Sequence, residues 1–183
     1  MSTGLTRNCR AFWWDARGIA GMEFAVMALA LGVALLNALD VGYYVYRRMQ
    51  VEMAAQVGAQ AAWKICSNQM TMLPATQNCA GLNAAITTAI QSTSLGTAVN
   101  LALGFPVEGY YCVNTSSNVL VSVGSLNNKP TSCTGIDSSG AAPGDYLEVQ
   151  VTYTYVPLFK GIATVISAMN IKSITKTSWI RLG

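Results

Sequence analysis

Apolar residues dominate one long stretch near the start of the chain, from Gly18 to Leu39, in which Glu23 is the single acid and Asn37 the single amide. A hydrocarbon core of about 30 Å needs about 20 helical residues. The stretch therefore predicts a transmembrane helix. No proline interrupts Val41–Ile65, so we expect the helix to continue beyond the membrane. The expected parts are a cytoplasmic leader (1–18), a transmembrane and extended helix (19–65) and an extracytoplasmic domain (66–183).

Shorter hydrophobic periods organise the rest of the chain. Some segments have apolar residues at helical spacing, and others are rich in residues that favour β-strands. The segment Ser125–Asp145 is rich in Gly, Ser, Asn, Thr and Pro, which predicts a loop. The predicted elements are a helix over Gly81–Ser92, a hairpin of Val107–Asn114 and Asn118–Val123, a half-buried strand over Tyr146–Val156, a short helix over Lys160–Ala168 and a strand over Ile171–Leu182. We expect an α+β fold, in which the long N-terminal transmembrane helix continues into a small extracytoplasmic domain with an antiparallel sheet.

Small residues repeat along one face of the extended helix, at Ala55, Gly58, Ala59 and Ala62. Such a face lets another backbone approach closely, as in helix pairs within membranes. It also suits a helix that lies on its own globular domain. The pattern leaves both interpretations open, and different faces can serve each.

Charges and rings beside the apolar stretch predict its orientation. Arg7, Arg10 and Arg17 precede it, and basic flanks stay in the cytoplasm. Tryptophans before it and tyrosines after it fit the two membrane interfaces. A secretory signal has an apolar region of only about 7–15 residues. We therefore expect the stretch to be kept as an anchor rather than removed after Ala28-Leu29-Ala30. The C-terminal bulk of the chain is therefore predicted to lie outside the cytoplasm.

The chain has five cysteines, and four of them follow the predicted span. An even number in an oxidising compartment predicts two disulfides among Cys66, Cys79, Cys112 and Cys133. Three pairings are possible. We favour Cys66–Cys79 and Cys112–Cys133, because each closes a short local loop, and a loop of about 15 residues stabilises by about 3 kcal/mol. Cys9 should be a free thiol.

Candidate chemistry is sparse. The chain has no histidine, which leaves no Ser-His-Asp or Cys-His machinery, and it lacks phosphate-binding glycine motifs. Charged residues make up 10% of the chain, with no basic run between aromatics, so nucleic-acid binding is not expected. A pair of the few acids beyond the span could in principle serve as acid and base or bind Ca²⁺, but we do not expect such a site; these acids are Glu52, Glu108, Asp137, Asp145 and Glu148. Asp137 and Asp145 are expected in turns. We expect neither enzyme activity nor a cofactor or metal.

The residues Arg17-Gly18-Ile19-Ala20-Gly21-Met22-Glu23-Phe24 resemble the prepilin processing signal of the tight-adherence (Tad, or Flp) pilus system. The pattern is a glycine, four residues, a glutamate and then Phe or Tyr, followed by an apolar helix. With Phe24 after Glu23, the chain is most similar to the TadE-like minor pilins, or pseudopilins. The stretch Val149–Trp179 is loosely similar to the same family. The chain departs from many pilins in having no proline in Ala25–Leu36.

The resemblance implies roles for these residues. Gly18 would precede the cut made by a membrane aspartyl prepilin peptidase, and Ile19 would become the new N-terminus. Glu23 would then neutralise the free amine of a neighbouring subunit. The implied partners are that peptidase, other Tad pilins and pseudopilins through the N-terminal helix, the inner-membrane assembly platform and membrane lipid. The resemblance also implies a location in the bacterial inner membrane, with a periplasmic or extracellular C-terminal domain.

The sequence therefore favours a processed, membrane-anchored minor pilin that takes part in pilus assembly and surface adhesion. The alternative is a single-pass anchored module whose extracytoplasmic domain binds a surface ligand and has no connection with pili.

Overall fold

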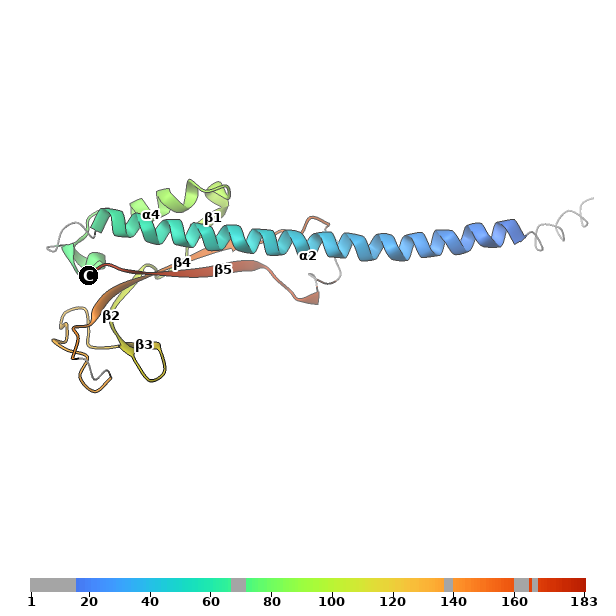
Figure 1. The fold of residues 1–183 in the computed structure, drawn as a ribbon. Helices are drawn as coiled ribbons and strands as arrows, with labels where there is room; N and C mark the ends of the chain where they lie inside the picture. The colour runs from blue at the N-terminus through green and yellow to red at the C-terminus, as the bar shows by residue number, and fades with distance from the viewer. Residues whose placement is uncertain (1–15, 67–71, 137–139, 160–164, 166–167) are drawn as a thin grey trace, which may run out of the picture. The chain divides into compact units, whose positions relative to one another are not determined.

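The computed structural model describes residues 16–66, 72–136, 140–159, 165 and 168–183. They belong to two compact units, Met1–Tyr43 with Pro157–Asn170, and Tyr44–Val156 with Ile171–Gly183, and each is described by itself. A long apolar N-terminal helix precedes a small antiparallel sheet, which confirms the predicted α+β class (Figure 1). The predicted leader up to residue 15 and nearly all of the predicted helix over Lys160–Ala168 lie outside the described residues.

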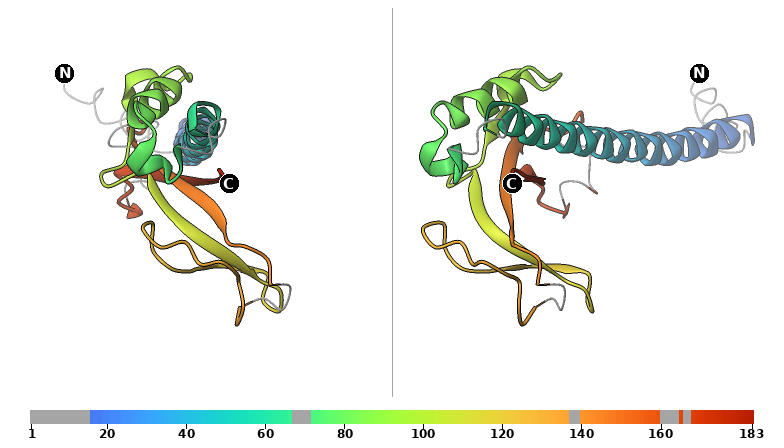
Figure 2. Two further views of the ribbon diagram at one scale, coloured as in Figure 1. Left: turned by 90° about the vertical axis from the view of Figure 1, so that its left-hand side faces the viewer. Right: turned by 60° about the vertical axis from the view of Figure 1, so that its left-hand side comes forward.

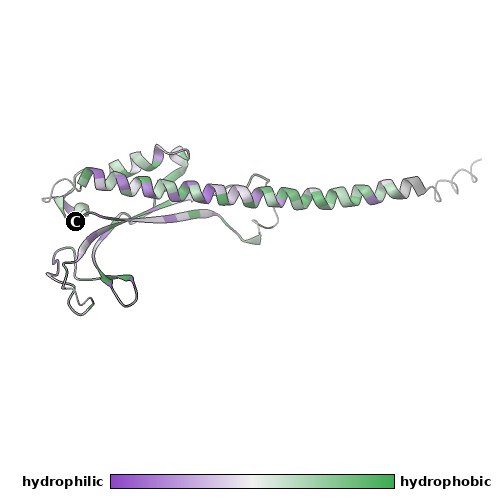
Figure 3. Ribbon diagram, viewed as in Figure 1, coloured by the Kyte–Doolittle hydropathy of each residue, from purple (hydrophilic) through white to green (hydrophobic). Residues whose placement is uncertain are grey.

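Helix α2 extends without interruption from Ala16 to Cys66. Its 51 residues correspond to a length of about 75 Å at about 1.5 Å per residue. Figure 3 shows that apolar residues line the N-terminal half, whereas polar and apolar residues alternate in the C-terminal half. The predicted continuation of the helix beyond the apolar stretch is confirmed.

Strand β4 is the centre of the second unit. One edge of β4 pairs with β5. The other edge pairs with β1 and, further along, with β2, and β2 pairs in turn with β3. All of these pairings are antiparallel. The strand bounds are β1 Val99–Leu101, β2 Val107–Asn114, β3 Val119–Ser122, β4 Gly144–Thr154 and β5 Ser173–Arg181. The predicted hairpin and both predicted C-terminal strands are present, with ends that differ by one or two residues.

Strand β1 was not expected from the sequence. It has only three residues, too few to show an alternating pattern. After it the backbone leaves the sheet over Ala102–Pro106 and returns as β2, so that both strands lie on the same edge of β4. Gly104 has a φ of 85° in this detour, a conformation that other residues seldom adopt.

One face of the sheet carries the core. Alternate side chains of β4 are buried as predicted, at Leu147, Val149, Val151 and Tyr153, and Tyr155 directly after the strand is buried too. Figure 2 shows α4 (Leu82–Gln91) and the C-terminal turns of α2 on the same side of the sheet. Helix α4 matches the predicted Gly81–Ser92 helix, and it buries Leu82, Ile86 and Ile90.

The small face of α2 packs within its own unit. Ala55, Ala59 and Ala62 are buried there. A methyl group added at Gly58 would lie 2.8 Å from Ile90 Cγ2 and 3.3 Å from Val149 Cγ1. Of the two interpretations that the sequence left open, this face therefore serves contact with the chain's own α4 and β4.

Two disulfides tie the loops to this core. Cys66, the last residue of α2, bonds to Cys79, and Cys112 on β2 bonds to Cys133, the pairing that short loops favour. Cys79 directly follows a short helix, α3 (Ala75–Asn78). The sequence did not predict this helix, because four residues are too few to show a periodic pattern.

Candidate functional site

The first half of α2 exposes apolar side chains on all sides of the helix. Consecutive residues of a helix lie about 100° apart around its axis, and the large exposed apolar side chains include Met22, Phe24, Val26, Met27, Leu29, Leu31 and Leu35. A helix that is apolar all round belongs in a bilayer or in the middle of a bundle, not in a single groove. Among the described residues, α2 is the one helix long and apolar enough to cross a membrane.

The residues of the processing motif lie at the start of this surface. Gly18 and Ile19 are in the first turn of α2, where the backbone N–H groups have no acceptors within the helix. That turn is the easiest part of a helix to unwind for a protease. Glu23 and Phe24 follow about one turn later, and both side chains are exposed, Phe24 to 76%. In the structure Glu23 lies beside Met22, Val26 and Met27.

Two polar side chains near the end of the apolar stretch hold another part of the chain. Asp40, which is fully buried, accepts a hydrogen bond from the backbone N–H of Leu158 through Oδ1 at 2.8 Å. Asn37 donates to the carbonyl of Val33 and accepts from the N–H of Val165 at 3.3 Å. Both contacts lie within the first compact unit. They attach the β4–β5 connection to α2.

Glu108 is a structural anchor in the sheet unit. From the core face of β2 its carboxylate accepts hydrogen bonds from the N–H groups of Ala75 and Thr76, at 2.6 and 2.7 Å, and from the Thr76 hydroxyl. The first N–H groups of a helix lack partners within it, so a carboxylate satisfies them well. Glu108 thereby joins β2 to α3.

Glu108 pairs with Leu147 on β4, and Asp145 lies two residues before Leu147 in the same strand. Because side chains alternate along a strand, Asp145 and Leu147 face the same side of the sheet. The prediction that Asp145 lies in a turn is wrong, because β4 begins at Gly144 and the Asp145 side chain is fully buried. Burial, and then the adjacent Glu108 carboxylate, raise the pKa of Asp145 from 3.8 to about 7, while the Lys129 ammonium lowers it. Burial and the charges of Asp145 and Glu108 also raise the pKa of Tyr110.

The protonated form of Asp145 suits this position. With both acids ionised, neither carboxylate oxygen of Asp145 has a hydrogen-bond donor among the described residues. A proton on Asp145 removes the charge and lets it donate to Glu108. Glu108 is occupied by α3, and both side chains are buried, so the pair is not placed to attack a substrate.

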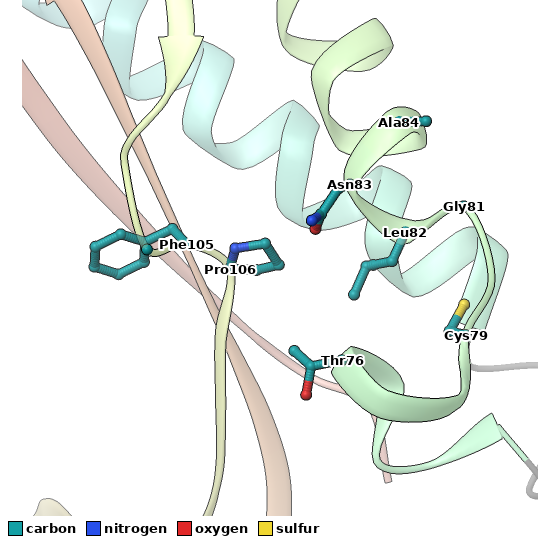
Figure 4. Close-up of a pocket in the computed structure, with 9 residues that line it drawn as sticks. Thr76, Cys79, Gly81, Leu82, Asn83, Ala84, Phe105 and Pro106 are labelled. Carbon is teal, nitrogen blue, oxygen red and sulfur yellow. The ribbon is translucent and has the colours of Figure 1, made fainter.

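A cavity of about 680 Å³ lies between α3, the start of α4 and the β1–β2 detour (Figure 4). Thr76, Leu82 and Asn83 point into it opposite Pro106. None of the residues that line it carries an ionisable group, since Cys79 is in a disulfide. The cavity offers apolar contacts and neutral hydrogen-bonding groups, without a nucleophile or a base.

Comparison of the chain with family models, with characterised proteins and with solved structures finds no match. Within the described ranges, no three His, Cys, Asp or Glu side chains form a group that could hold a metal ion. The functional argument therefore depends on the residues themselves.

The sequence located part of the candidate site. It identified Gly18, Ile19, Glu23 and Phe24, which lie in the first turns of α2, where Glu23 and Phe24 are exposed. It missed the attachment of the β4–β5 connection to Asn37 and Asp40. The one available signal was the presence of two polar residues at the end of an apolar stretch, where an acid needs a partner.

Proposed function

We propose that the chain is a membrane-anchored minor pilin, or pseudopilin, of the tight-adherence type, cut by a prepilin peptidase and used in pilus assembly and surface adhesion. One observation carries the proposal: Gly18 and Glu23 have the processing spacing directly before a helix half that exposes apolar side chains on all sides. An isolated anchor needs the apolar surface but not the glycine and glutamate before it.

The lengths of the two halves of α2 support the anchoring part of the proposal. A bilayer core of about 30 Å takes up about 20 residues, which leaves the second half of α2 outside. That second half packs on the sheet through Gly58 and its small neighbours. The basic residues Arg7, Arg10 and Arg17 favour a cytoplasmic N-terminus, so the sheet unit would lie beyond the inner membrane.

Glu23 gives the proposal its mechanism. An ionised acid at the centre of a membrane helix costs about 2.5–3.5 kcal/mol, and less near the end. A cut between Gly18 and Ile19 creates a new amine at the start of the same helix in each subunit. Pairing of Glu23 with that amine on a neighbouring subunit would offset the cost and align the two helices. The other partners would be further Tad pilins and the assembly platform, and the role would be structural rather than enzymatic.

Processing is tested by sequencing the N-terminus of the protein from the membrane fraction of cells that contain the peptidase. We expect the mature chain to begin at Ile19. Gly18→Val should leave the precursor uncut, because a branched side chain replaces the glycine that precedes the scissile bond. Gly21→Ala is the matched control, since a methyl group there meets nothing within 4 Å, and it should be cut normally. An active protein that keeps its leader would refute the proposal.

A further inference from the structure

The connection between β4 and β5 exposes apolar side chains beside α2. Leu158 is 53% exposed, Val165 46% and Met169 62%. All three residues belong to the same compact unit as the apolar half of α2. The N–H groups of Leu158 and Val165 donate to Asp40 and Asn37, and the N–H of Met169 donates to the carbonyl of Val165.

The position of the attachment along α2 indicates its depth. Asn37 and Asp40 flank Leu39, the last residue of the apolar stretch. Tyr43, Tyr44 and Tyr46 follow within the next two turns, at about 1.5 Å per residue. Tyrosine is enriched at the boundary between hydrocarbon and headgroups. The connection is thus level with the place where the span would leave the outer leaflet.

The hydrogen bonds made by Asn37 and Asp40 suit that depth. Irregular backbone beside hydrocarbon must have its N–H groups satisfied by the protein, because no water is available there. Asp40 provides the acceptor for the N–H of Leu158, and Asn37 provides one for that of Val165. Leu158 and Val165 can therefore approach lipid with their own N–H groups satisfied.

We propose that Leu158, Val165 and Met169, in the described parts of the β4–β5 connection, form a second membrane contact and enter the outer-leaflet interface beside α2. The proposal rests on the proposed membrane span. Lipid is the occupant because Leu158 and Val165 are bonded to Asp40 and Asn37, at the level where the span would leave the hydrocarbon, and their apolar side chains are exposed there. The contact would fix the rotation of α2 about its axis as well as its depth.

The test uses the full chain with Cys9→Ser, reconstituted at low density in vesicles of phosphatidylethanolamine and phosphatidylglycerol that contain nitroxide-labelled lipids. A fluorophore is attached to a single new cysteine, from Leu158→Cys or Met169→Cys. Nitroxides near the headgroups should quench both sites strongly. Thr115→Cys, in the exposed β2–β3 turn, should not be quenched. Leu31→Cys, within the span, should be quenched by nitroxides deep in the bilayer.

The controls separate the two proposals. Quenching at Leu31 without quenching at Leu158 and Met169 would overturn the second contact and leave the span intact. Absence of quenching at all three would overturn the span as well. If the Met169 site is shielded from lipid and forms pyrene excimers with a second copy, the surface is a subunit interface and the proposal is wrong.

A pair of variants tests the attachment. Asp40→Ala removes the acceptor for the N–H of Leu158 and should sharply reduce quenching at Leu158→Cys. Asp40→Asn retains a carbonyl oxygen in the same place and should restore quenching. Equal quenching in both variants would show that Asp40 does not hold the connection at the membrane. Circular dichroism checks that the sheet unit is folded in each.

Discussion

Glu108 and Asp145 are two buried acids on one sheet face, but their surroundings differ. Glu108 accepts hydrogen bonds from the backbone N–H groups at the start of α3. Asp145 has the negative charge of Glu108 beside it, which raises its pKa, and the positive charge of Lys129, which lowers it. A group whose pKa is raised on folding binds more protons in the folded state, so protonated Asp145 contributes stability at low pH. That contribution is complete below about pH 4 and is lost as pH rises to about 7.

Asp145→Asn should remove this pH dependence. Asn is neutral and can donate to Glu108 at every pH, so the variant should match the original protein near pH 4. At pH 8, the free energy of unfolding of the variant should be higher than that of the original protein by on the order of 1–3 kcal/mol. The reason is that the ionised Asp145 destabilises the original protein there, and one pKa unit corresponds to about 1.4 kcal/mol. Thermal unfolding in detergent between pH 4 and 8 measures the difference. Glu148→Gln, on the opposite sheet face, is the control, and a less stable Asp145→Asn at pH 8 would contradict the assignment.

Helix α2 serves two environments along its length. Its first half exposes apolar side chains, while its second half packs against α4 and β4. Within the sheet unit, Lys176 on β5 forms an ion pair with Glu52 at 3.1 Å, and the rings of Tyr44 and Tyr155 meet edge to face. Exposed ion pairs contribute little, so the buried small face, with its close approach at Gly58, contributes more to holding this half on the sheet.

Gly58→Leu should therefore destabilise the sheet unit by about 1–3 kcal/mol, because added side-chain atoms must displace Ile86, Ile90 and Val149. Gly42→Ala is the matched control in the same helix, where a methyl group meets nothing within 4 Å. It should be neutral or raise stability by up to about 1 kcal/mol, as alanine favours the helix. Near-ultraviolet circular dichroism during thermal unfolding reports the packing of the sheet unit. Equal melting of both variants would show that the contact is not tight.

The whole chain joins an apolar helix half to a disulfide-linked sheet unit. The two candidate functions use these parts differently. A minor pilin needs the helix for contact with other subunits, whereas an anchored binding module needs it only to stay in the membrane. Glu23 distinguishes them, because an anchor gains nothing from an acid at the start of its span.

Glu23→Ala should abolish pilus assembly in the bacterium while the protein still accumulates, is still cut at Gly18 and remains in the membrane. Pili counted by electron microscopy and adhesion to a surface are the measurements. Glu148→Ala, in β4 of the sheet unit, controls for loss of an acid and should assemble normally. Normal assembly and adhesion in the Glu23 variant would favour the binding module.

Part of the candidate site was predictable because its signal is local. The spacing of Gly18 and Glu23 is a short linear pattern, and the apolar stretch behind it needs no tertiary contact to be recognised. Asn37 and Asp40 gave no such signal, because their partners lie 128 and 118 residues away in the chain. No periodicity connects residues at that distance.

The same distinction runs through the fold. Local periodicity was sufficient for α2, for the buried stripe of α4 and for the alternation of β4, since each pattern repeats within a few residues. The short loops between cysteines favoured the disulfide pairing for the same reason. Tertiary contacts were needed to place β1 on the edge of β4, to bury Asp145 beside Glu108 and to set the small face of α2 against the sheet. Each of these depends on which distant segment lies opposite, and that is decided by packing of the whole unit rather than by any residue's neighbours in the chain.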